Sequence, residues 1–94
     1  MDDSTMVTVA ELGRIDALSR ADRPNEAERA ALSLTAAYPD LPQAWIALGD
    51  LLRQQEKFAQ AVPAYDKALS LLKDAPAEAR WFPLYARGIA LERS

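Results

Sequence analysis

One stretch, AWIALGDLLRQQEKFAQAVPAYDKA, constrains the fold of this chain more than any other. Its large and small apolar residues recur at helical spacing, at Trp45, Leu48, Gly49, Leu52, Ala61, Tyr65 and Ala68. Such spacing predicts two amphipathic helices separated by a short turn. Glycine in the middle of a helix costs about 1 kcal/mol relative to alanine. Its presence at position 49 therefore predicts that a second helix packs where a side chain would not fit.

The same stretch matches nearly every position of the W-x2-L-G-x2-Y…A-x3-F pattern of a helix-turn-helix repeat. It resembles a tetratricopeptide repeat. The resemblance implies that Trp45, Gly49, Ala61 and Tyr65 are scaffold. It also implies that the residues between them face a concave surface, on which some members of the family bind ligands.

The pattern recurs along the chain, although less completely. A shift of about 34 residues, which is the period of this family, aligns Leu18 with Leu52 and Ala27 with Ala61. We expect one domain built from three copies. They are a degenerate repeat at 7–40, a full repeat at 41–74, and a half repeat or capping helix at 76–93.

The third copy departs from the period. Gly88 corresponds to Gly49 but lies more than one period after it, which predicts a longer loop around residues 74–80. A capping helix needs a polar outer face, whereas Trp81 and Ile89 lie on a helix with little polar surface. We therefore expect a segment cut from a longer array rather than a cap.

Apolar periodicity and helix-breaking residues predict five helices, at about 6–20, 24–37, 42–55, 57–72 and 77–92. We expect residues 1–5 to be a frayed end, Asp22 to cap the second helix, and Pro24 to lie in its first turn. Pro83 predicts either a kink in the last helix or its true start. The predicted buried faces of the first two helices include Ala10 and Ala17 on the first and Ala27, Ala30, Ala31, Leu34 and Ala37 on the second. With the resemblance, the fold class is all-α, a right-handed α-α superhelix of about five antiparallel helices.

Composition excludes several classes of function. The chain has neither cysteine nor histidine, so it has no thiolate, no imidazole ligand and no Ser-His-Asp triad. Its net charge is −3 and its basic residues are scattered, which disfavours nucleic acid as a partner. We predict no catalytic, cofactor-binding or metal-binding residues. We interpret Asp16 and Asp50, equivalent in the repeat, as two solvated acids on a groove wall.

The resemblance places a groove on the first helix of each repeat. The residues expected to face it are Val9, Leu12, Asp16, Ser19 and Arg20, then Gln43, Ile46, Asp50, Arg53 and Gln54, and finally Phe82, Tyr85, Ile89, Glu92 and Arg93. Among them, the predicted partner-binding residues are Leu12, Asp16, Arg20, Ile46, Asp50, Arg53, Gln54, Phe82 and Tyr85. Some co-chaperone relatives clamp a terminal carboxylate with Lys, Asn and Arg. This chain has Leu12, Asp16, Ala47, Phe82 and Ala86 there, so chaperone tails are disfavoured.

These observations predict a non-catalytic protein-protein interaction module that holds a protein or peptide in its concave groove. Two alternatives stay open. Exposed aromatic residues on the last helix, such as Phe82 and Tyr85, would make the chain a self-associating homo-oligomer. Alternatively, the chain is an accessory region of a larger enzyme. It has no apolar run long enough for membrane insertion and no secretory signal, so the cytoplasm is the default expectation for its location.

Overall fold

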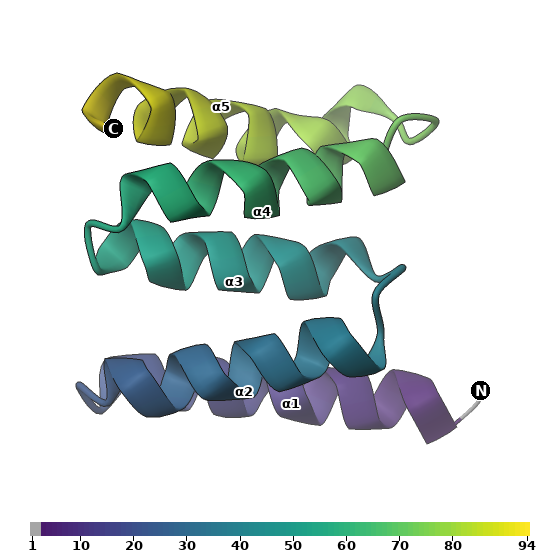
Figure 1. The fold of residues 1–94 in the computed structure, drawn as a ribbon. Helices are drawn as coiled ribbons and strands as arrows, with labels where there is room; N and C mark the ends of the chain where they lie inside the picture. Colours follow the sequence, from purple (N-terminus) through teal and green to yellow (C-terminus); the bar gives the residue numbers. More distant parts are fainter. Residues whose placement is uncertain (1–2) are drawn as a thin grey trace.

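A computed structural model describes the backbone of residues 3–94 and the side chains of residues 9–94. This part of the chain folds into five α-helices joined by short turns (Figure 1). The helices are α1 (Asp3–Arg20), α2 (Pro24–Ala37), α3 (Pro42–Gln54), α4 (Phe58–Leu71) and α5 (Ala77–Arg93). The all-α class predicted from the sequence is confirmed.

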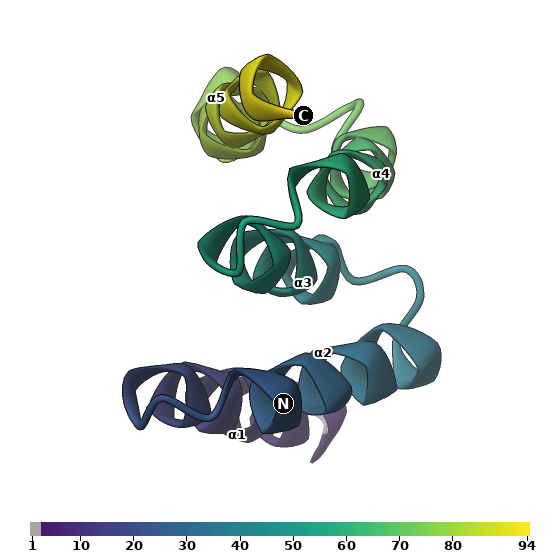
Figure 2. The same cartoon turned by 60° about the vertical axis from the view of Figure 1, so that its left-hand side comes forward.

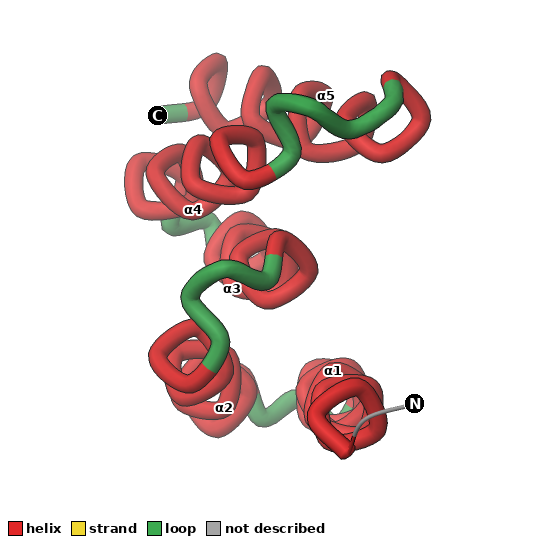
Figure 3. The backbone as a smooth tube through the Cα atoms, turned by 90° about the vertical axis from the view of Figure 1, so that its right-hand side faces the viewer, coloured by secondary structure: helices red, strands yellow, loops and turns green. Residues whose placement is uncertain are grey.

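Consecutive helices run antiparallel and pack against each other, from α1 to α5 in chain order (Figures 1 and 2). In addition, α3 contacts both α1 and α5. Seen along the helices, α1, α3 and α5 lie on one side of the stack, and α2 and α4 lie on the other (Figure 3). The first helices of the predicted repeats therefore form one common surface.

Proline sets the start of two helices. Pro24 and Pro42 each occupy the first turn, where a missing N–H costs nothing. The first helix, however, begins earlier than expected. Residues 3–5 are helical rather than frayed, and the remainder of the predicted frayed end, residues 1–2, lies outside the described residues.

The turn after α1 and the turn after α3 have the same geometry at equivalent places in the repeat. Asp22 and Glu56 adopt φ angles of 60° and 62°, the left-handed region. In each turn the next residue donates its N–H to a carbonyl near the end of the preceding helix, from Arg23 to Leu18 at 3.0 Å and from Lys57 to Leu52 at 2.8 Å. This pattern is the Schellman motif that ends many helices.

The predicted capping role of Asp22 is therefore wrong. Arg23 is the N-cap residue of α2, and no side chain caps that helix. Asp22 instead occupies the left-handed position that ends α1, because aspartate tolerates that conformation better than most residues.

Replacing Glu56 by Gly is expected to raise the free energy of unfolding by about 1 kcal/mol, because glycine adopts a positive φ without steric cost. Asp22→Gly is the matched control. Its free energy of unfolding should rise by less, since aspartate already tolerates a positive φ angle. Urea unfolding followed by circular dichroism measures both. A loss of stability in Glu56→Gly would contradict the conformation assigned to this turn.

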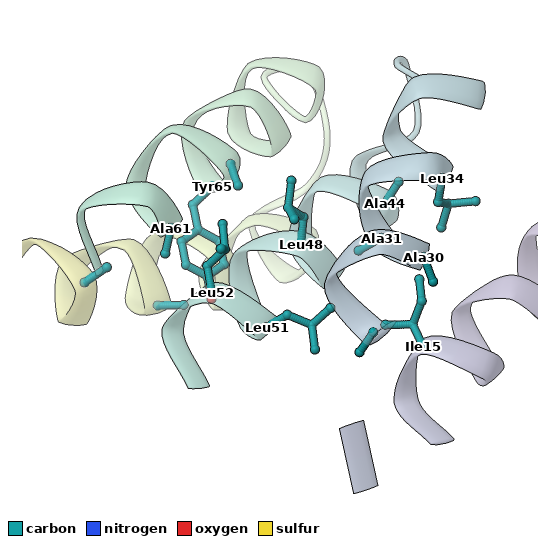
Figure 4. Close-up of a cluster of buried hydrophobic side chains, with 14 residues drawn as sticks. Ile15, Ala30, Ala31, Leu34, Ala44, Leu48, Leu51, Leu52, Ala61 and Tyr65 are labelled. Carbon is teal, nitrogen blue, oxygen red and sulfur yellow. The ribbon is translucent and has the colours of Figure 1, made fainter. Parts of the chain in front are cut away.

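Small residues dominate the core. Buried alanines let the helices approach closely, and they surround larger side chains such as Leu34, Leu48 and Tyr65 (Figure 4). These alanines are Ala27, Ala30, Ala31, Ala44, Ala61, Ala64, Ala68, Ala86 and Ala90. Among the residues predicted on the buried faces of the first two helices, Ala27, Ala30, Ala31 and Leu34 are buried, whereas Ala10, Ala17 and Ala37 are exposed. On α2 it is Thr35, with its hydroxyl bonded to the Leu32 carbonyl at 2.9 Å, that is buried instead.

The contact between α3 and α4 confirms the packing predicted from Gly49. A Cβ atom at this position would lie 2.8 Å from Cε1 of Tyr65, a side chain that is completely buried. Real Cβ atoms essentially never come so close to another heavy atom. The glycine is thus required by the ring that packs on it.

The loop before the last helix is shorter than the sequence predicted. It spans residues 72–76 and is only slightly longer than the connection at 38–41, because residues 77–80 already belong to α5. Most of the extra residues of the third copy therefore extend its helix. Pro83 lies inside α5 and is buried, so it is not the start of the helix.

Candidate functional site

A pocket of about 130 Å³ lies between α1 and α3, on the surface that these helices share with α5. Apolar side chains and two carboxylates line it. The lining residues are Leu12, Ile15, Asp16, Ser19, Ala47, Asp50, Leu51 and Gln54. Asp16 and Asp50, which are equivalent in the repeat, therefore face the same pocket.

A hydrogen bond links the two helices at one end of this pocket. Ser19 Oγ donates to Gln54 Oε1 at 2.9 Å. Both residues are among those expected to face a groove. The bond holds the Gln54 carboxamide in place and leaves its NH₂ group to donate to another molecule.

Asp16 is an exposed carboxylate held by its neighbour on α1. Its Oδ2 lies 3.1 Å from Arg20 Nε, an ion pair one helical turn apart, and both side chains are more than half exposed. Exposed pairs of this kind contribute only about 0.3–0.5 kcal/mol. A ligand that competes for either group therefore loses little by breaking the pair.

Asp50 is different, because a buried tyrosine from α4 fixes it. The Tyr65 hydroxyl donates to Asp50 Oδ1 at 2.6 Å, and Arg53 Nε donates to the same hydroxyl oxygen at 3.1 Å. Arg53 also lies 3.5 Å from Asp50 in an ion pair. Asp50 is less solvated than the sequence predicted, since its side chain and that of Arg53 are each only 28% exposed.

Burial determines the ionisation of this cluster. It raises the pKa of the Asp50 carboxyl above its ordinary 3.8, although the Tyr65 hydroxyl and Arg53 partly offset the shift. Burial and the bond to Asp50 also raise the pKa of the Tyr65 phenol. The phenol is consequently neutral at physiological pH and acts as a fixed hydrogen-bond donor. Asp50 also lines the pocket between α1 and α3.

A wider hollow of about 340 Å³ lies between the end of α3, the start of α4 and the end of α5. Charged and apolar side chains line it. The lining residues are Arg53, Gln54, Glu56, Phe58, Ile89 and Arg93. The Arg93 guanidinium lies 5.8 Å from the centre of the Phe58 ring, within the range of a cation–π contact.

The structure separates the predicted binding residues into two groups. Five of them line these hollows, namely Leu12, Asp16, Asp50, Arg53 and Gln54. The other four, Arg20, Ile46, Phe82 and Tyr85, line neither. Arg20 still reaches the surface through its ion pair with Asp16, and Ile46 is half-buried.

The two aromatic residues of α5 have different environments. Phe82 packs against the hydrophobic core and meets Trp81 edge-on, with ring centroids 5.9 Å apart. It is therefore only partly available as an apolar anchor. The Tyr85 ring, in contrast, is 63% exposed.

Sequence reasoning missed the role of Tyr65 in this surface. The repeat pattern marks it as scaffold, which its complete burial supports, yet its hydroxyl crosses to Asp50 on the adjacent helix. The spacing contains one relevant signal. Glycine at position 49 leaves room for the ring to reach across α3, and Asp50 is the next residue.

The described residues offer little for other chemistry. Among the side chains of residues 9–94, no group of three or more carboxylates lies close enough to hold a metal ion. Within the same described region, no helix combines the length and the apolar composition needed to cross a membrane. The two hollows are lined by hydrogen-bonding, charged and apolar side chains.

Comparison with protein families gives one match. Residues 42–75, the segment from α3 to the turn after α4, match the family model described as Tetratricopeptide repeat. Comparison with curated proteins gives no match. The segment that matches contains Gly49, Tyr65 and Asp50, the residues that connect the scaffold to the groove.

Proposed function

We propose, from the premise that this chain belongs to the tetratricopeptide repeat family through residues 42–75, that the surface of α1, α3 and α5 binds a segment of a partner protein. Repeats of this family are protein-interaction scaffolds and are typically non-catalytic.

The observation that carries the proposal is the position of Gln54. This exposed residue near the end of α3 lines both the pocket beside α1 and the hollow beside α5. The two hollows share this lining residue, which supports a single binding surface from Leu12 to Arg93. A surface of this length suits a chain segment better than a small molecule.

The chemistry of the surface defines the bound segment. Leu12 and Ala47 offer apolar contact, and Asp50 accepts hydrogen bonds with a carboxylate that is already fixed by Tyr65. Fixing a group before binding reduces the entropy lost in the complex. We infer a segment with an apolar side chain next to hydrogen-bond donors, in extended or helical form.

Gln54→Arg is expected to weaken binding at least tenfold, because the longer charged side chain fills the junction of the two hollows. The probe is a set of peptides selected from a random displayed library on the wild-type chain. Their affinities are then measured by fluorescence anisotropy.

The matched control is Gln60→Arg, the same substitution at an exposed site on α4, in the other layer. It should leave the affinities unchanged. Gln54→Arg avoids the hydrogen bonds around Tyr65, so the circular dichroism of the variant should equal that of the wild type. Unchanged affinities in Gln54→Arg, or equal losses in both variants, would overturn the proposal.

A further inference from the structure

The side of α5 that faces away from α4 is apolar and open. We call Trp81, Leu84, Gly88 and Leu91 the α5 outer face. Their spacing of three and four residues places them on one stripe of the helix, and the three side chains are 61%, 54% and 46% exposed. A Cβ atom at Gly88 would meet nothing within 4 Å. Among the described residues, no helix covers this face.

The same face is covered on α3. Aligning Gly49 with Gly88 matches the two helices on one side, where the paired Ala44 and Pro83 are both buried, as are the paired Leu51 and Ala90. The alignment also pairs Leu52 with Leu91. On α3, Gly49 lies against the Tyr65 ring of α4, and Leu52 lies close to the same ring (Figure 4). On α5 the paired glycine and leucine lie open.

We propose that the α5 outer face binds an amphipathic helix of a partner protein, packed as α4 packs on α3, with an aromatic side chain seated over Gly88. The contact between α3 and α4 is the template. There, atoms of the Tyr65 ring lie 2.8–3.0 Å from the position of a Cβ on Gly49. Ala61 and Ala68, about one turn on either side of Tyr65, are buried and small.

This geometry defines the chemistry of the partner. Its contact face carries one aromatic residue flanked by alanine or another small residue about one turn away on each side. The aromatic ring fills the space that Gly88 leaves, while the small residues let the two backbones approach. Leu84 and Leu91 would then contact the ends of the ring, as large apolar side chains do in a helix interface.

A second copy of the chain fits this description less well. The face of α4 that has the required pattern, with Ala61, Tyr65 and Ala68, is already buried in the fold. The exposed aromatic side chains of α5 are not flanked in this way, since Tyr85 has Trp81 and Ile89 one turn away on either side. A separate partner helix is therefore favoured over self-association.

The test uses a peptide with the sequence of α4, residues 58–71, acetylated and amidated, added to the ¹⁵N-labelled chain. The expected result is a saturable change in the amide resonances of Leu84, Gly88 and Leu91. A peptide with Ala in place of Tyr65 should bind at least tenfold more weakly. Gly88→Leu in the chain should weaken the wild-type peptide by a similar factor.

Gly88→Leu also separates binding from folding. Because nothing lies near Gly88, the variant should melt at or above the temperature of the wild type. Gln54→Arg serves as a second control, since it alters the groove and should leave the affinity for this peptide unchanged. Failure of the groove proposal is thus distinguishable from failure of this one.

Three results would overturn the inference. The first is a peptide affinity that Gly88→Leu does not change. The second is a set of resonance changes centred on the groove residues Asp50 and Gln54 or on Gly49. The third is a concentration-dependent dimer in sedimentation equilibrium that Gly88→Leu dissociates, because a second copy would then occupy the α5 outer face.

Discussion

Tyr65→Ala is expected to lower the free energy of unfolding by about 3–5 kcal/mol, as truncations of large buried aromatic residues do. The ring is completely buried and packs on the backbone of α3 at Gly49. Its removal leaves a cavity between α3 and α4, and it also removes the donor that holds Asp50. A domain of this size has a stability of only about 5–15 kcal/mol, so the variant should lose much of it.

The measurement is urea unfolding followed by far-ultraviolet circular dichroism. Tyr65→Phe is the control that separates the ring from the hydroxyl, because it keeps the packing and removes only the hydrogen bonds to Asp50 and Arg53. Leaving a largely buried carboxylate without its donor costs about 1–3 kcal/mol. A decrease in the free energy of unfolding of less than about 1–3 kcal/mol for Tyr65→Ala, the decrease expected for Tyr65→Phe, would contradict this prediction. The ring would then not hold α3 and α4 together as the structure indicates.

Gly49→Ala and Gly88→Ala should change stability in opposite directions, although the two glycines occupy equivalent places in the repeat. At position 49 the new methyl group would overlap the Tyr65 ring, at 2.8 Å. Overpacking of this kind costs about 1–3 kcal/mol. The ring has little room to move, because its hydroxyl is bonded to both Asp50 and Arg53.

At position 88 the new methyl group meets nothing within 4 Å. The higher helix propensity of alanine should then raise the free energy of unfolding by about 1 kcal/mol. Thermal and urea unfolding of the two single variants measure the difference directly. An equal increase in the free energy of unfolding of both variants would mean that the Tyr65 ring moves easily to make room for a methyl group. The close contact with Gly49 would then not constrain the fold.

The sequence predicted the scaffold well because helices depend mainly on local pattern. Apolar spacing and the prolines at 24 and 42 placed all five helices within a few residues of their observed bounds. The candidate site was harder to predict. Leu12, Asp16, Asp50 and Gln54 were expected on one surface, and they line one pocket.

Other features depend on packing between helices that are distant in sequence. Phe82 and Tyr85 are both aromatic and lie three residues apart on the same helix. Phe82 nevertheless packs on the core, whereas Tyr85 is exposed. Which of them is buried depends on the rotation of α5 against α4. The extra residues at the start of α5 change the place of Gly88 within its helix, and a repeat pattern alone does not show this.

The sequence by itself determined the number and approximate position of the helices and that something must pack on Gly49, because propensity, proline placement and residue size act locally. Only the tertiary structure decided that the packing group, Tyr65, also reaches Asp50 and makes it a fixed acceptor instead of a solvated acid. The same holds for the two glycines. Gly49 and Gly88 read alike in the sequence, but one is covered and the other open, because only α3 has a helix packed on that side.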